Sequence, residues 1–270
     1  MLHLVVALEC EARPLAARHR LKLSKAEHPC RIYEGEGARL VVSGVGKAAA
    51  AGASGYLQGV VRQRHGVWLN VGIAGHRDRP VGQGFLAHKV VDGASGRSWY
   101  PPLLFRPASA TETVLTVDRP ERRYRDGVAY DMEAAGFLAV ASRFTTAELV
   151  HVYKVVSDGL HHPVDELSAR KVERLVEGAL DDIDSVLLEL AGLAAELEGL
   201  GASPAGLDEF LERWHFTVSE RRRLRRVLQR LEIVDPGWKP GDLEPTRRCR
   251  GRDVLRELED RLNALPVRVV

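Results

Sequence analysis

The sequence lacks clustered cysteines. Its three cysteines, Cys10, Cys30 and Cys249, lie far apart in a chain of 270 residues, and none belongs to a Cys-x-x-Cys pair. Their spacing therefore predicts no metal site. Their odd number is typical of a protein from a reducing compartment and not of a disulfide-bonded scaffold.

Long hydrophobic runs are also absent. No apolar stretch reaches the roughly 18–20 residues that a membrane-spanning helix needs. The N-terminus, Met-Leu-His-Leu-Val-Val-Ala-Leu-Glu, has no basic segment and reaches an acidic residue at position 9. It predicts a buried first strand and not a signal peptide, so we expect a cytoplasmic protein without a membrane partner.

Neither sign of charge is in excess. The chain has 39 basic and 37 acidic residues and is 45% hydrophobic, which is typical of an ordinary globular protein. This balance argues against a polyanionic partner such as nucleic acid. At this length the chain can form one full α/β domain and a smaller appendage.

Two kinds of segment alternate up to about residue 195. Short, β-branched apolar runs are followed by segments with helical periodicity, and this alternation predicts an α/β domain with a central mixed sheet flanked by helices. The expected strands are Leu4–Leu8, Arg31–Gly35, Leu40–Ser43, Val67–Val71, Leu86–Val91, Thr113–Val117 and Leu149–Val156, and the expected helices are Glu11–Arg20, Lys47–Arg64, Met132–Phe144 and Val164–Ala195.

The composition changes after residue 195. The segment Gly-Leu-Gly-Ala-Ser-Pro at 199–204 is a typical breaker and linker. We therefore interpret residues 1–195 as one domain and residues 202–270 as a small helical domain of unknown role. The run Arg221–Arg226 in this second domain is either a solvated basic face or a contact for nucleic acid or an acidic partner. The expected helices are Leu207–Trp214, Val218–Leu231 and Gly251–Leu265.

Three segments place carboxylates next to expected strand ends, where α/β proteins build their sites. They read Ala-Leu-Glu-Cys-Glu-Ala at 7–12, Asp-Met-Glu-Ala-Ala at 131–135 and Val-Val-Ser-Asp-Gly at 155–159. Asp131 can cap the helix that follows it. Glu133 is flanked by apolar residues and requires another partner, such as a sugar diol. Asp158 is either an ordinary loop carboxylate or a proton donor suited to a purine nitrogen.

Two turns that contain glycine also follow expected strands. The sequence Gly-Val-Gly-Lys-Ala-Ala at 44–49 has the form of a dinucleotide fingerprint, but the required acid about 20 residues later is missing. A tight turn that lets a strand and a helix pack closely is the alternative. The sequence Asn-Val-Gly-Ile-Ala-Gly at 70–75 would let a planar or phosphorylated ligand approach the backbone, although such turns are also common for structural reasons.

Taken together, these segments resemble the purine nucleoside phosphorylase/uridine phosphorylase superfamily in their order and approximate positions. Residues 1–195 are most similar to its methylthioadenosine/S-adenosylhomocysteine nucleosidase branch and to the hopanoid-associated phosphorylase branch. The resemblance implies a homodimeric enzyme that needs no metal or other cofactor. Its substrate would be an adenine nucleoside, methylthioadenosine-like or with a bulkier 5′ group, whose N-glycosidic bond it cleaves.

The resemblance also implies roles for individual residues. Glu11 matches the glutamate that orients the attacking water, and Asp158 matches the acid that protonates N7 of adenine, so both are expected to be catalytic. Met132 matches the methionine beneath the ribose, and Glu133 matches the glutamate that binds the 2′ and 3′ hydroxyls. The remaining residues expected to support the acid or contact the substrate are Ser157, Ile73, Ala74 and Gly75.

The identity of the nucleophile separates hydrolysis from phosphorolysis. Phosphorylases of the superfamily have an arginine and a serine where this chain has Asn70 and Ile73, so a bidentate phosphate ligand is missing. Water is therefore the expected nucleophile. Phosphorolysis stays open as an alternative, because Arg13, Arg77 or Arg79 could form a different phosphate pocket.

One part of the chain departs from the resemblance. The interval from Gly82 to Asp131 is shorter than in typical nucleosidases, and it contains the apolar run Trp-Tyr-Pro-Pro-Leu-Leu-Phe at 99–105. This run is either a dimer contact or a lid over the site. The short interval also leaves a second hypothesis open, a non-catalytic nucleoside-binding sensor whose helical tail binds a partner. A water-orienting Glu11 favours the enzyme, since a sensor does not need one.

Overall fold

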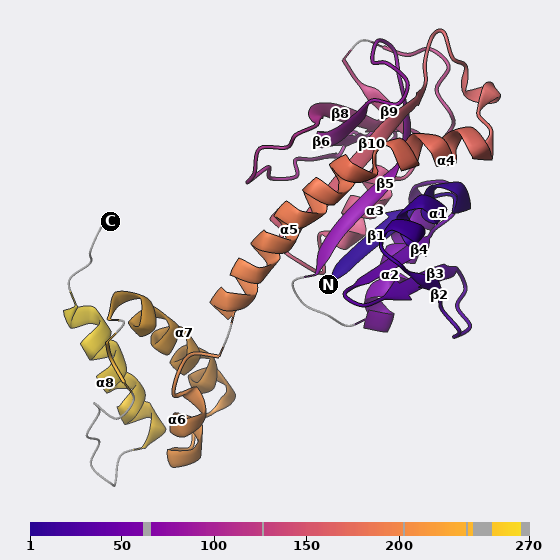
Figure 1. The fold of residues 1–270 in the computed structure, drawn as a ribbon. Helices are drawn as coiled ribbons and strands as arrows, with labels where there is room; N and C mark the ends of the chain where they lie inside the picture. The colour runs from indigo at the N-terminus through magenta and orange to yellow at the C-terminus, as the bar shows by residue number, and fades with distance from the viewer. Residues whose placement is uncertain (62–65, 126, 202, 236, 240–249, 266–270) are drawn as a thin grey trace. The chain divides into compact units, whose positions relative to one another are not determined.

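The computed structural model divides the chain into two compact units, Met1–Glu198 and Gly199–Val270. It describes residues 1–61, 66–125, 127–201, 203–235, 237–239 and 250–265. Cys249 and the last residues of the expected helix Lys47–Arg64 lie outside this part of the chain. Figure 1 shows the course of each unit.

A mixed sheet forms the centre of the first unit (Figure 1). Strands β1, β4, β5 and β10 run parallel, whereas β5–β9, β6–β10, β3–β4 and β2–β3 are antiparallel pairs. The strands are β1 (Leu2–Val6), β2 (Lys22–Leu23), β3 (Arg31–Gly35), β4 (Ala38–Val42), β5 (Val67–His76), β6 (Gly84–Asp92), β7 (Ser98–Trp99), β8 (Ala110–Thr116), β9 (Ala129–Asp131) and β10 (Val150–Asp158).

Five of these strands close into a ring. Strand β5 pairs with β10, β10 with β6, β6 with β8, β8 with β9, and β9 returns to β5. Strands β5 and β10 therefore end side by side, with Asp158 in register with Gly75. The ring brings the end of β9, which leads into a helix, to the same edge.

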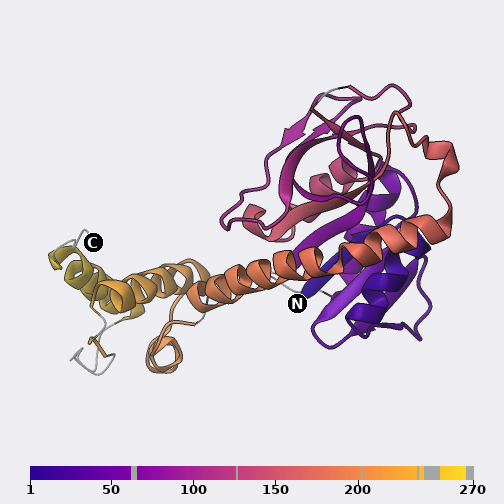
Figure 2. The ribbon, with the colours of Figure 1, turned by 45° about the horizontal axis from the view of Figure 1, so that its top comes forward.

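Helices cover both faces of the sheet because alternate strand residues point to opposite sides. Leu4 and Val6 of β1 belong to one hydrophobic core, which contains residues of α1, α4 and α5. Val5 belongs to the other core, which contains residues of α2 and α3. Figure 2 shows α4 and α5 running along one face. The helices are α1 (Glu9–Arg18), α2 (Lys47–Val61), α3 (Ala134–Ala141), α4 (Ala169–Gly178) and α5 (Leu180–Gly201), with short 3-10 turns at Ala147–Leu149 and Val164–Glu166.

The predicted α/β class is confirmed, but one predicted helix is wrong in detail. The helix expected over Val164–Ala195 is two helices. The first begins after Ser168, whose hydroxyl accepts the N–H of Lys171, and ends at Gly178. Glycine has a low helix propensity, and the amide of Ala179 turns back to the carbonyl of Val176 before α5 starts. In addition, β5 continues beyond the expected Val71 to His76.

The second unit contains the helices α6 (Leu207–Arg213), α7 (Val218–Val234) and α8 (Gly251–Ala264) around a hydrophobic core of its own. Thr217 and Glu220 form a capping box at the start of α7. Leu224 and Leu228 of α7 are buried, whereas Arg222 is exposed. In the described part of both units, every helix is too short or too polar to span a bilayer.

Candidate active site

A cavity of about 410 Å³ opens where β5 and β10 end. It is bordered by the start of α1, the ends of β5, β9 and β10, and the start of α4. Ligand sites of α/β folds occur at such strand ends. All of the residues expected at the site line this cavity, namely Glu11, Ile73, Ala74, Gly75, Met132, Glu133, Ser157 and Asp158.

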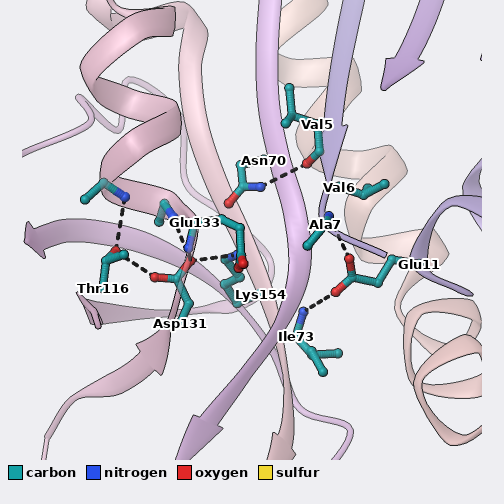
Figure 3. A network of polar contacts seen from close by, with 12 residues as sticks. Val5, Val6, Ala7, Glu11, Asn70, Ile73, Thr116, Asp131, Glu133 and Lys154 are labelled. Atoms are coloured by element: carbon teal, nitrogen blue, oxygen red, sulfur yellow. Dashed lines mark hydrogen bonds and ion pairs between the residues drawn. The ribbon is translucent and has the colours of Figure 1, made fainter. Parts of the chain in front are cut away.

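Three backbone amides hold the carboxylate of Glu11, and Figure 3 shows two of them, those of Ala7 and Ile73. Its Oε2 accepts the N–H groups of Ala7 (2.9 Å) and Leu8 (2.8 Å), and its Oε1 accepts the N–H of Ile73 (3.0 Å). Glu11 is the third residue of α1, from which a glutamate can reach back to the amide before the helix. A carboxylate has about four acceptor positions, so roughly one position is left for another donor.

The surroundings of Glu11 change its affinity for a proton. Burial raises the pKa of Glu11, although the charge of Lys154 and the amide bonds oppose this effect. A raised pKa makes the carboxylate a stronger acceptor for a proton from water. Gly72 makes the arrangement possible, since a Cβ atom there would lie 2.9 Å from Oε1 of Glu11.

A buried ion pair lies close to Glu11 (Figure 3). Nζ of Lys154 is 2.9 Å from Oδ2 of Asp131, and both side chains are almost completely buried. Asp131 also accepts the hydroxyl of Thr116 (2.6 Å) and the N–H of Ala134 (2.8 Å), so it caps the start of α3. Burial lowers the pKa of Lys154, but the negative charges of Asp131 and Glu133 have the larger effect, so the pKa is raised overall.

Glu133 connects this ion pair to the first glycine turn. Its Oε1 accepts the N–H of Gly46 at 2.8 Å. Gly46 has φ +105°, a left-handed conformation that favours glycine, so the turn at 44–47 presents an amide to the site. Burial raises the pKa of Glu133, with Lys154 acting in the opposite direction. Glu133 retains acceptor positions for the hydroxyl groups of a ligand.

Each oxygen of Asp158 receives a hydroxyl group. Tyr124 donates to Oδ2 at 2.5 Å, and Ser157 donates to Oδ1. A Cβ atom at position 75 would lie 2.5 Å from Oδ2 of Asp158 and 2.6 Å from Cε1 of Tyr124. The two side chains can therefore meet because residue 75 is glycine.

The described lining of the cavity contains acidic residues and no arginine, lysine or histidine. Arg13 pairs with Glu173 at 3.6 Å, and Arg79 pairs with Glu112 at 2.9 Å. Asn70 donates to a backbone carbonyl of β1 (Figure 3). Within the described residues, no group of three or more His, Cys, Asp or Glu side chains could hold a metal ion. The acidic lining residues are Glu11, Glu121, Asp131, Glu133 and Asp158.

The apolar run at 99–105 does not line the cavity. Tyr100 and Leu104 are 65% and 64% exposed, whereas Leu103 and Phe105 pack against a hydrophobic core. This position favours a surface contact over a lid. The described residues between Gly82 and Asp131 form strands and irregular segments but no helix.

Sequence reasoning missed two residues that shape the site, Lys154 and Tyr124. Lys154 interrupts the apolar run of β10, and a single charge in a buried strand is a signal that it must have a partner. Tyr124 lies in the irregular segment between β8 and β9. No periodic pattern in that segment indicates where its side chain points.

Comparison with solved structures identifies the fold. The methylthioadenosine/S-adenosylhomocysteine nucleosidase of Neisseria meningitidis, in complex with methylthio-immucillin-A, is 18% identical, and the match covers 66% of this chain and 97% of that one with a TM-score of 0.53. The methylthioadenosine nucleosidase of Arabidopsis thaliana is 16% identical, with coverages of 72% and 95% and a TM-score of 0.56. The futalosine hydrolase of Helicobacter pylori is 15% identical, with coverages of 70% and 97% and a TM-score of 0.54.

No protein-family model matches the chain, and neither does any curated protein sequence. The chain has the fold of these enzymes, and the matches cover nearly the whole length of each of them. The predicted nucleoside phosphorylase-like fold is therefore confirmed.

Proposed function

We propose that this chain hydrolyses the N-glycosidic bond of an adenine nucleoside. The observation that carries the proposal is the convergence of Glu11, Glu133 and Asp158 on one cavity. A cavity of about 410 Å³ is within the range of small-ligand sites. The proposal is also supported by the fold shared with nucleosidases that were solved with nucleoside analogues.

The proposed chemistry divides the work among these residues. As the bond between the anomeric carbon and the purine weakens, the sugar gains oxocarbenium character and the leaving base gains negative charge. Asp158 neutralises that charge by giving a proton to N7. Glu11 accepts a proton from water while the water oxygen bonds to the anomeric carbon. The products are free adenine and the sugar, and no cofactor takes part.

Glu133 and Met132 position the sugar in this proposal. Glu133 would accept hydrogen bonds from the 2′ and 3′ hydroxyls, and Met132 would pack beneath the ribose. Holding the sugar between a fixed acid and a fixed base removes much of the entropic cost of reaction. The substrate would be methylthioadenosine or a nucleoside with a bulkier 5′ group. We assign the reaction to residues 1–195 and expect a cytoplasmic homodimer.

The charge of the cavity favours water over phosphate as the nucleophile. A phosphate ion would meet the carboxylates of Glu11 and Glu133 without a basic residue of the described lining to bind it. Such an anion requires charge-assisted donors, of which arginine is the most effective. We therefore place hydrolysis before phosphorolysis.

Product analysis by chromatography tests the proposal. The protein is incubated with adenosine, methylthioadenosine, S-adenosylhomocysteine, 5′-deoxyadenosine and inosine, with and without phosphate. We expect adenine release without phosphate, its loss in Asp158→Asn, and its retention in Asp165→Asn, a matched control at an exposed ion pair. Release that requires phosphate would establish phosphorolysis. Binding of adenosine without release from any substrate would support the sensor.

A further inference from the structure

Tyr124 lines the cavity, but the proposed reaction does not use it. Its side chain is buried, and its hydroxyl donates to Oδ2 of Asp158 at 2.5 Å. Its ring packs edge-on against Tyr130 with 5.9 Å between ring centroids. The hydroxyl of Tyr124 therefore contacts Asp158, the acid of the proposed reaction.

Both oxygens of Asp158 are engaged in this arrangement. Ser157 donates to Oδ1, and Tyr124 donates to Oδ2. A carboxyl group can pass a proton to a purine nitrogen only when one of its oxygens lies about 2.6–3.2 Å from that nitrogen. Each oxygen keeps a second acceptor position, so an entering base reaches the carboxyl group either beside a bound hydroxyl or by displacing that hydroxyl.

The surroundings indicate which hydroxyl moves. Ser157 belongs to β10, is completely buried and also lies 3.4 Å from the carbonyl of Ala74. Tyr124 belongs to the irregular segment between β8 and β9 and borders the cavity. Turning the tyrosine side chain breaks one hydrogen bond and leaves every strand pairing intact.

We propose that the hydroxyl of Tyr124 occupies the base-facing oxygen of Asp158 in the empty site and that an entering adenine displaces it. This inference rests on the proposed function, in which a proton from solvent is taken up at Oδ2 as the base enters, so that Oδ2 donates to N7 instead of accepting from Tyr124. Burial, followed by the bond to Asp158, raises the pKa of Tyr124, so the hydroxyl keeps its proton and acts as a donor. Tyr124 is a positioning residue that orients the carboxyl group until the base arrives.

The competition has a consequence for ligand selection. A hydrogen bond to a charged group contributes to an equilibrium constant by a factor of about ten or more. A base that enters the site must replace this bond with one of its own at Oδ2. The site therefore selects bases with a nitrogen at position 7. Every base binds more weakly than it would without Tyr124, because the bond from Tyr124 to Asp158 must first be broken.

Calorimetric titration with 9-deazaadenosine tests the inference. This nucleoside has a carbon–carbon bond between base and sugar, so it cannot be hydrolysed, and it carries an N–H at position 7. We expect Tyr124→Phe to lower the dissociation constant about tenfold, because the competing donor is gone. In the kinetics of a cleavable substrate, KM should fall by more than kcat changes.

Two controls separate this role from a structural one. Tyr33→Phe removes a tyrosine–carboxylate bond, that to Glu9, outside the cavity, and it should leave the dissociation constant unchanged. In an Asp158→Asn background, Tyr124→Phe should change the constant less than about twofold, because a neutral amide holds the hydroxyl weakly.

Several outcomes would overturn the inference. Unchanged or weaker binding by Tyr124→Phe would show that Tyr124 contacts the base directly or has only a structural role. An equal change in the dissociation constant with Asp158 and with Asn at position 158 would lead to the same conclusion. If Tyr124→Phe does not fold, protein labelled with 3-fluorotyrosine keeps the ring and has a stronger donor. Labelled protein should bind 9-deazaadenosine more weakly, and equal or tighter binding contradicts the competition. A wild-type protein that neither binds 9-deazaadenosine nor releases adenine overturns the proposed function itself.

Discussion

Nζ of Lys154 lies 2.9 Å from Oδ2 of Asp131, with the two side chains 1% and 0% exposed. Asp131 ends β9 and Lys154 lies in the middle of β10, and Glu11 and Glu133 are near enough to influence the pKa of the lysine. One positive charge therefore acts on three carboxylates and offsets part of their mutual repulsion. Removing this charge would leave Asp131 buried without its charged partner.

Replacing Lys154 with methionine should destabilise the protein strongly. The substitution leaves Asp131 buried without its charged partner, and breaking a buried pair in this way costs about 3–5 kcal/mol. Urea denaturation measures the change in the free energy of unfolding. Arg122→Met, which breaks an ion pair with side chains 68% and 60% exposed, is the control and should cost less than about 1 kcal/mol. Equal losses in the two variants would contradict the burial argument.

Glu11→Gln should remove most of the activity while the protein stays folded. The amide cannot accept a proton from water, and loss of a positioned base lowers kcat by about 10²–10⁴-fold. The measurement is the rate of adenine release under saturating substrate. Glu9→Gln alters a neighbouring carboxylate of α1 that does not line the cavity and should retain activity. Comparable losses in both variants would mean that Glu11 has only a structural role.

The same residue predicts the acid side of the pH profile. Glu11 must be unprotonated to act as a base, and burial raises its pKa above the ordinary value of 4.5. We therefore expect kcat/KM to rise with pH through a value above 4.5. A profile that is already flat at pH 4.5 would argue against Glu11 as the base.

The sequence predicted the parts of the site that depend on strand ends and local motifs. The role expected of Glu11 came from the resemblance. The expected helix began at Glu11, whereas α1 begins at Glu9, so Glu11 is its third residue and reaches back to the preceding amides. Asp158 could be placed because it ends a buried apolar run. Tyr124 could not be found in this way, since its contact with Asp158 joins an irregular segment to a distant strand. The break between α4 and α5 at Gly178 was missed because the hydrophobic pattern continues through it.

Gly75→Ala should disable the site more than it destabilises the fold. The added Cβ atom would lie 2.5 Å from Oδ2 of Asp158 and 2.6 Å from Cε1 of Tyr124, so both side chains must shift. Misplacement of a reacting group by about 1 Å can lower the rate about 10²-fold, and overpacking costs about 1–3 kcal/mol. Kinetics and thermal unfolding measure the two effects.

A matched glycine variant provides the comparison. Gly52 lies within α2, and a Cβ atom there meets nothing within 4 Å. Gly52→Ala should therefore stabilise the protein by about 0.5–1 kcal/mol and leave activity unchanged. If Gly75→Ala behaves in the same way, the close approach at Asp158 has no functional importance.

Acid should destabilise the protein through two buried histidines. Burial lowers the pKa of both His3 and His151 from the ordinary 6.5 to about 4. The unfolded chain therefore binds protons first as the pH falls below 6.5, and the free energy of unfolding decreases until about pH 4. Each histidine accounts for about 3 kcal/mol across this interval.

Substitution of His3 isolates its share of this acid sensitivity. The ring of His3 packs on Trp68 with 4.5 Å between centroids, so His3→Phe retains an aromatic contact and removes the titrating group. Urea denaturation at pH 7 and pH 4.5 should show a smaller loss of stability in His3→Phe than in the unaltered protein. The exposed His161 provides the control, since His161→Gln should leave the difference between the two pH values unchanged. An equal loss in His3→Phe and the unaltered protein would mean that the acid sensitivity arises from other groups. A buried neutral histidine lowers the free energy of unfolding in acid only because it takes up a proton when the chain unfolds.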